Sequence, residues 1–314
     1  MEYQKKLIDI ISRYVPEDEK LVDFISGLIH LGKEASYRRI RCEVEFTLSE
    51  VVTIAKKLNI NLTSLIIREG GEKVTCNLRL IDETSAVHGY IKKIEADLNI
   101  LEGFEKKSGS TFYTVNRSIP ELFYFPYTYL TKLKLFKIQF NKGTVQPLPL
   151  AQIDIPDVLS KVRQEYWDEI KLFKLIFILD PNLLTSVVND ISFFYNLNLI
   201  TEEEKNQLKR ELISVLDTIN ESASTGLYRG KKVSFYVSHV TLALSHSLIV
   251  SKGLEASIIN LHYPNSLLSF DQEMTQAQMK RLQIIKKCSS LISQSGELNK
   301  IAFLNRQREK LYHL

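Results

Sequence analysis

Signals for the start and end of helices near the N-terminus constrain the fold of this part of the chain more than any other feature. An apolar pattern at helical spacing ends at Gly32, a residue that favours a helix C-cap. Further on, Thr47 and Glu50 form a capping box, in which each side chain bonds to the backbone N–H of the other residue. The sequence therefore predicts two helices, with a short third helix between them at about residues 33–43. The apolar residues of the first helix are Leu21, Phe24, Ile25 and Leu28.

The short middle helix is rich in arginine. Tyr37 and Ile40 lie three residues apart and share one face, so we expect them to pack against the flanking helices. Polar residues are then left mostly on the exposed side, as in the recognition helix of a helix-turn-helix, where arginine binds guanine or phosphate. The alternative is a solvated arginine face on an ordinary helical hairpin. The candidate DNA-binding residues are Lys33, Ser36, Arg38, Arg39 and Arg41.

Positive charge is unevenly distributed along the chain. The net charge is only +4, with ten basic and ten acidic residues in 1–67 and with eight basic and two acidic residues in 280–314. A nucleic-acid surface needs positive charge clustered on one face, and the total says little about it. The low net charge therefore does not exclude DNA binding.

Length and composition indicate a soluble protein with two or three folding units. The chain has 314 residues, of which 44% are hydrophobic and 25% are charged, as in ordinary globular proteins. We expect a helix-turn-helix domain at residues 1–68, a helical intermediate region at 69–145, and a C-terminal α+β region for dimerisation or sensing at 146–314. The predicted fold is mainly α: an N-terminal helix-turn-helix bundle, then a helical region with a small antiparallel sheet near the C-terminus.

Two segments support this mainly helical assignment. Residues 158–179 are interpreted as one helix, whereas residues 231–263, rich in Val, Ser, Ile and Tyr, predict two to four strands of the small sheet. Residues 120–140 are dense in Phe, Tyr and Leu, and a stripe of this length at helical spacing favours core over a base-stacking surface.

Several classes of site and location are not supported by the sequence. The three cysteines, Cys42, Cys76 and Cys288, give neither a disulfide framework nor a zinc cluster. His239 and His246 would lie on opposite faces of a continuous strand, so they cannot easily share a metal. No local catalytic motif occurs, and no apolar run reaches membrane-spanning length. We therefore expect no enzyme, no metal, no cofactor and no membrane partner, in a cytoplasmic protein without a signal peptide.

Residues Leu21 to Ile66 resemble a helix-turn-helix of the Cro and phage-repressor class. The whole chain also resembles a poorly characterised family of bacterial regulators in which such a domain precedes a helical C-terminal region. The resemblance implies transcriptional regulation through double-stranded DNA, without indicating the target genes. The segments that carry it are LGKEASYRRIR (31–41), IPELFYFPYTYLTKLKLFKIQF (119–140), LLSFDQEM (267–274) and KKCSSLISQSGELNKIAFLNRQREKL (286–311).

The function expected from the sequence is sequence-specific DNA binding by a transcriptional regulator, with the helix at about 33–43 in the major groove. The alternative is a protein-interaction adaptor that uses the arginine helix on an acidic partner. We expect a homodimer, held by apolar surface in residues 122–140 and in the helices from Val158 onward; if that surface is internal core, the chain is a monomer. A small-molecule or protein signal is possible, and the sequence does not identify it.

Overall fold

The computed structural model describes residues 2–16, 18–58, 60, 62, 74–81, 85–104, 109–141, 143, 149–261, 263–312 and 314. The chain divides into two compact units, Met1–Thr75 and Cys76–Leu314, called here the N-terminal and C-terminal units. The sequence analysis expected a boundary between two regions near residue 145. In the structure, residues on both sides of this position contribute strands to one sheet of the C-terminal unit.

The N-terminal unit is a small helical bundle. Its core contains fully or almost fully buried aliphatic residues from three helices, including Leu7, Ile25 and Ile54. The capping box predicted at residues 47–50 is present, with the Thr47 N–H donating to the Glu50 carboxylate at 2.9 Å and the Glu50 N–H donating to Thr47 Oγ1 at 3.3 Å. The helices are α1 (Glu2–Ser12), α2 (Leu21–Ile29), α3 (Lys33–Ile40) and α4 (Leu48–Leu58).

The turn between α2 and α3 differs from the prediction in one respect. His30, and not Gly32, takes the left-handed conformation that ends α2, with φ of 54°, and its backbone N–H bonds to the Ser26 carbonyl. Gly32 is extended, with φ of −65°, and precedes α3 as its N-cap. Glycine at this place is therefore not required by a positive φ.

The expectation of a mainly α fold with a small C-terminal sheet is wrong, because a nine-stranded mixed sheet organises the C-terminal unit. The strand order is β1-β8-β7-β6-β2-β3-β5-β4, and β9 pairs with β5. Strands β2, β3 and β5 are parallel, and the other pairs are antiparallel. The strands are β1 (Asn77–Arg79), β2 (Thr111–Asn116), β3 (Lys174–Leu179), β4 (Leu227–Tyr228), β5 (Lys231–Ser238), β6 (His246–Ser251), β7 (Leu254–Asn260), β8 (Ser266–Ser269) and β9 (Ser289–Leu291).

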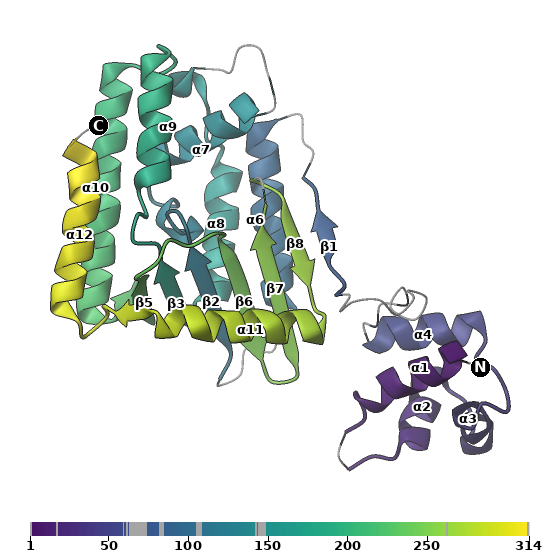
Figure 1. Ribbon diagram of the computed structural model, residues 1–314. Coiled ribbons are helices and arrows are strands. Elements are labelled where there is room, and N and C mark those ends of the chain that lie inside the picture. The colour runs from purple at the N-terminus through teal and green to yellow at the C-terminus, as the bar shows by residue number, and fades with distance from the viewer. Residues whose placement is uncertain are drawn as a thin grey trace. The chain divides into compact units, whose positions relative to one another are not determined.

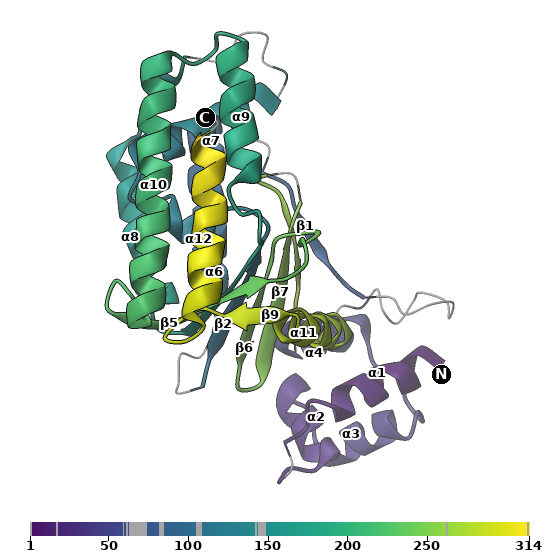
Figure 2. The same ribbon diagram turned by 60° about the vertical axis from the view of Figure 1, so that its left-hand side comes forward.

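Helices cover both faces of this sheet (Figures 1 and 2). Most of the described helices stack on one face, and α11 crosses the other. None of the described helices has both the length and the apolar character needed to cross a membrane. The helices are α6 (Ala86–Glu102), η1 (Glu121–Phe123), α7 (Thr128–Asn141), η2 (Leu150–Gln152), α8 (Asp157–Ile170), α9 (Thr185–Asn196), α10 (Glu202–Thr225), α11 (Gln272–Lys287) and α12 (Glu297–Tyr312).

Strand β3 explains the largest error in the sequence-based assignment. Residues 158–179 were expected to form one helix, but α8 ends at Ile170 and β3 begins at Lys174. Phe177 of β3 faces the main helix layer, whereas Ile178 packs in the smaller core under α11. A strand buried on both faces lacks the alternation of polar and apolar residues that marks a half-buried strand, so a short apolar run is compatible with either structure.

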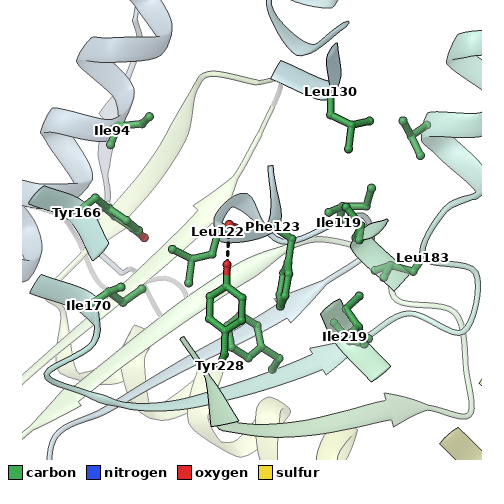
Figure 3. Close-up of a cluster of buried hydrophobic side chains, with 14 of the residues drawn as sticks. Ile94, Ile119, Leu122, Phe123, Leu130, Tyr166, Ile170, Leu183, Ile219 and Tyr228 are labelled. Carbon is green, nitrogen blue, oxygen red and sulfur yellow. Dashed lines mark hydrogen bonds between the residues drawn. The ribbon is translucent and has the colours of Figure 1, made fainter. Parts of the chain in front are cut away.

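Aromatic side chains fill the main core where η1 meets the parallel strands. The rings of Phe177 and Phe235 stack with their centroids 5.1 Å apart, and the ring of Phe123 lies on Phe177 at 5.8 Å. Figure 3 shows this region, with the Tyr228 hydroxyl donating a hydrogen bond to the Leu122 carbonyl at 3.2 Å. The pairing of Phe177 with Phe235 in the sheet register aligns the two rings.

Much of the segment at 120–140 is core, as its apolar stripe indicated. Five of its aromatic side chains, Tyr124, Phe125, Tyr127, Tyr129 and Phe140, are only half-buried, and the dimer interface expected there stays a prediction. The buried residues of this segment include Leu122, Phe123, Leu130, Leu133, Leu135, Phe136 and Ile138.

We predict that Ile25→Ala destabilises the N-terminal unit by roughly 2–5 kcal/mol, because it opens a cavity in a small core. Hydrogen exchange followed by mass spectrometry should show faster exchange throughout residues 2–58. Trp167, the only tryptophan in the sequence, is buried in the C-terminal unit. Its fluorescence therefore reports the unfolding of the C-terminal unit, which the substitution should leave unchanged. Leu48→Ala is the control, because Leu48 is 78% exposed. Equal effects of the two substitutions would contradict this assignment of the core.

Candidate functional site

One side of α3 carries a row of exposed side chains. Tyr37 is 46% exposed, and the side chains of Arg38 and Arg41 are 59% and 69% exposed. Lys33 lies on the same exposed surface at the start of the helix. The Arg41 guanidinium lies 5.8 Å from the centre of the Tyr37 ring. Tyr37 is thus not the core anchor expected from its spacing, whereas Ile40 does pack against the core. We call Lys33, Tyr37, Arg38 and Arg41 the α3 surface.

Two of the candidate DNA-binding residues instead face the interior. Ser36 is fully buried and accepts a hydrogen bond from the Ser26 hydroxyl at 2.9 Å. Arg39 is 12% exposed, and its Nε and Nη2 donate to the two oxygens of Glu50 at 2.9 and 2.8 Å. The expectation that these two side chains are exposed is therefore wrong. Tyr37 and Arg41 lie one helical turn apart on the outer side of α3. Ser36 and Arg39 therefore lie on the side that faces the neighbouring helices.

Glu50 connects the capping box of α4 to α3. Burial acts to raise the pKa of Glu50, but hydrogen bonds from Arg39 and from the backbone of Thr47 outweigh it and hold the pKa below 4.5. The carboxylate is thus charged when it receives the bidentate contact of Arg39, which is a strong and directional type of ion pair.

Helices α1 and α2 fix the two ends of α3. Gln4 on α1 donates from Nε2 to the carbonyls of Arg39 and Val44, at 2.7 and 2.8 Å. Lys33 at the start of α3 contacts Asp23 on α2, and this hydrogen bond raises the pKa of Lys33. The contacts of Arg39 and Gln4 therefore hold the middle and end of the helix, whereas the Lys33–Asp23 pair at its beginning is exposed.

The two exposed arginines have only loose partners. Arg38 and Arg41 each lie near Glu43, at 3.9 and 3.8 Å, and all three side chains are exposed. Ion pairs of this kind contribute little to stability, so both guanidinium groups can exchange Glu43 for a phosphate or a base edge at low cost. The α3 surface thus combines exposed cations with an aromatic ring on a fixed helix.

A second candidate site is a cavity of about 580 Å³ inside the C-terminal unit. It lies between the sheet and the helix layer, beside the carboxyl end of β2. Along one row of the sheet register, Phe235 and Phe177 are followed by Thr114 and Ser247. Thr114 and Ser247 are smaller than the phenylalanines, so they leave space in this row on β2 and β6, whereas the rings of Phe177 and Phe235 fill it on β3 and β5. Ligands of open α/β sheets bind at this end of the strands, in pockets of this size.

Six charged side chains form a buried network beside the cavity. Arg79 and Lys93 both donate to Asp97, at 2.8 and 2.7 Å, and Lys134 contacts Glu121. Arg163 joins the network through Tyr90. The side chains of Arg79, Lys93, Asp97, Glu121 and Lys134 are between 11% and 19% exposed, and Arg163 is 7% exposed.

Tyrosine side chains complete the network. Tyr90 donates to Glu121 at 2.6 Å and accepts from Arg163 Nη2 at 3.2 Å. The Lys134 ammonium lies 4.5 Å and 4.3 Å from the ring centres of Tyr124 and Tyr263. Lys134 is therefore held by two rings and Glu121 by the Tyr90 hydroxyl, in addition to their contact with each other, which fixes the polar wall of the cavity.

The network shifts the pKa values of its members. Burial acts to raise the pKa of Glu121, but the charges of Lys134 and Lys93 outweigh it and lower the pKa from 4.5 to about 2. Burial lowers the pKa of Lys134 to about 8, and the positive charges of Lys93 and Arg163 act in the same direction against the attraction of Glu121. Burial is thus the main cause of the lowered pKa of Lys134.

The described residues contain no group of three or more His, Cys, Asp or Glu side chains that could hold a metal ion. His246 is buried at the start of β6, and its burial lowers its pKa, whereas His239 lies beyond the end of β5 and bonds to the Ser290 hydroxyl at 3.0 Å. All three cysteines are free thiols.

The sequence did not predict the cavity. Its only local signal was the mixing of lysines with aromatic residues in 120–140, which was interpreted as ordinary core. The partners of Glu121 and Lys134 on α6 and in the β7–β8 connection, including Lys93 and Tyr263, are distant in sequence and become neighbours only when the sheet forms.

No family model matches the chain, and comparisons with curated proteins and with solved structures find no match. The two sites therefore have to be interpreted from their own geometry.

We predict that Arg39→Ala destabilises the N-terminal unit by about 1–3 kcal/mol, because it leaves the largely buried Glu50 carboxylate without its main partner. Arg38→Ala is the matched control on the same helix and should change stability by less than about 0.5 kcal/mol. Chemical denaturation with pulsed hydrogen exchange, followed over residues 2–58, measures both. If Arg39→Ala were as stable as Arg38→Ala, the assigned bracing role of Arg39 would be wrong.

We also predict a difference in acid sensitivity between the native chain and Glu121→Gln. In the unfolded chain Glu121 takes up its proton near pH 4.5, whereas the folded chain keeps it ionised to about pH 2. The stability that Glu121 contributes is therefore complete above about pH 4.5 and is lost as the pH falls towards 2. Between about pH 6 and about pH 3 the native chain should lose on the order of 2 kcal/mol more than the variant. Urea unfolding followed by Trp167 fluorescence tests this, and parallel pH profiles would contradict it.

Proposed function

We propose that the chain is a sequence-specific DNA-binding transcriptional regulator that inserts α3 into the major groove. The observation that carries this proposal is the α3 surface, in which three cations and one aromatic ring extend from a helix that Arg39, Gln4 and Ser36 fix in place. A helix of eight residues, held by neighbouring helices on its inner side, is of a size that the major groove accepts.

Division of labour among the arginines supports this proposal. Arg39 holds the helix, so Arg38 and Arg41 can project with defined geometry and grip guanine or phosphate. Tyr37 offers both a ring for contact with bases or sugars and a hydroxyl for a phosphate. The DNA-binding residues we propose are therefore Lys33, Tyr37, Arg38 and Arg41, in place of the set expected from the sequence.

Two copies of the chain would make the binding stronger. One helix-turn-helix covers only a few base pairs, and residues 1–67 carry equal numbers of acidic and basic residues. We propose a homodimer that acts in the cytoplasm and binds inverted half-sites about 34 Å apart. The half-buried aromatic side chains of the segment at 120–140 and the helices from Val158 onward are the candidates for its interface.

We predict that Arg38→Ala and Arg41→Ala each weaken binding to a preferred duplex by about 1–3 kcal/mol, because each removes a base or phosphate contact. The preferred duplex is first enriched from a random library with the full chain, and affinity is then measured by fluorescence anisotropy. Lys56→Ala, which removes an exposed cation from α4, is the control for a general loss of charge.

Hydrogen exchange of residues 2–58 must remain native in each variant. Unchanged affinity in both arginine variants would remove α3 from the recognition role. Failure to enrich any duplex, together with arginine-dependent binding of an acidic peptide, would favour the adaptor function instead.

A further inference from the structure

We propose that the cavity of the C-terminal unit binds a small organic anion with an apolar body and up to two negative charges, such as a phosphate monoester or a carboxylate. This inference does not depend on the proposed DNA binding, because it concerns residues of the C-terminal unit alone.

The charge balance of the buried network points to an anion. The network contains four cations and two carboxylates, so it carries two positive charges in excess within the described chain. Its cations are Arg79, Lys93, Lys134 and Arg163, and its carboxylates are Asp97 and Glu121. Buried charges are costly unless they are compensated, and an anion in the adjoining cavity would compensate these.

The other charged groups on the cavity wall do not remove this excess. Lys137 and Asp190 contact each other and contribute no net charge. Arg117, which follows β2, adds a further positive charge, and its Nη1 lies 3.5 Å from the Ala243 carbonyl. Lys93, Asp97, Glu121 and Lys134 themselves form part of the wall and balance one another in charge. The positive excess therefore comes from Arg79 and Arg163, which are next to these residues but do not line the cavity, and from the exposed Arg117 on the wall.

An unused polar group also lies in the wall. The hydroxyl of Tyr263 is buried and has no hydrogen-bond partner among the residues that the structure describes, although buried hydroxyls normally have one. Tyr263 also places its ring against the Lys134 ammonium. Its hydroxyl can therefore donate to an anionic group bound close to Lys134.

The remaining wall suits an apolar body. It is formed by aliphatic and aromatic side chains from the sheet and from the helices above it, so the cavity is polar on one side and apolar on the other. This arrangement is typical of small-molecule sites, in which a few polar groups fix the orientation of a mainly apolar ligand. The apolar side chains include Leu101, Phe112, Leu133, Ile170, Ile249 and Ile258.

Ligands that share one apolar chain and differ in the charge of the head group test the proposal. Octyl phosphate, octanoate, octanol and octylamine are titrated into the full chain by calorimetry, below their micelle concentrations. We expect one site per chain, with octyl phosphate and octanoate binding at least about tenfold more tightly than octanol and with no binding of octylamine. No binding of octyl phosphate at millimolar concentration, or equal binding of octylamine, would overturn the proposal.

Two variants locate the binding site. Lys134→Met should weaken the binding of octyl phosphate by about tenfold and leave the binding of octanol unchanged. Lys132→Met is the matched control, because Lys132 lies two residues earlier on the same helix and outside the cavity, and it should change neither affinity. Ser247→Phe should block binding of all the octyl ligands, because it fills the space in the register row beside Thr114 while leaving the charged network intact.

Native Trp167 fluorescence is the control for folding. If Lys134→Met does not fold, Ser247→Phe decides alone. Undiminished octyl phosphate binding in a folded Ser247→Phe chain would place the ligand elsewhere and contradict the proposal.

Discussion

The burial of β3 on both faces is the constraint on which the C-terminal unit depends. Its neighbours on both sides run parallel to it, so the helices that connect them must cross over the sheet and cover it. Aromatic rings from β3 and β5 fill that space, and the row then changes to Thr114 and Ser247 on the adjoining strands. The cavity exists because the same layer of helices spans one row of the sheet in which the side chains are large on β3 and β5 and small on β2 and β6.

The N-terminal unit depends on an equally local arrangement, the bidentate contact between Arg39 and Glu50. This contact ties α3 to the capping box of α4, so a single carboxylate serves two helices. Rigid support of this kind is needed for sequence-specific contacts, because side chains on a loosely held helix would bind phosphate without reading bases. The arginines in α3 are alike in chemistry, yet their positions on the helix give them different roles.

Local signals predicted local structure well. The capping box predicted at Thr47 is present, and α4 begins directly after it. The rotation of α3 was not predicted, because Tyr37 is apolar enough to pass for core while the true inward residues, Ser36 and Arg39, are polar and are satisfied by partners on other helices. The sheet was missed for a related reason, since pairing partners distant in sequence decide whether a short apolar run becomes a strand.

The central claim is that the outward side of α3 meets duplex DNA. Hydrogen exchange of the full chain, with and without a duplex enriched by the chain itself, tests it most directly. The account predicts slower exchange in the turn after α2 and in residues 33–44, with little change in the described helices that cover the sheet of the C-terminal unit. Protection confined to the C-terminal unit, with α3 unchanged, would contradict it.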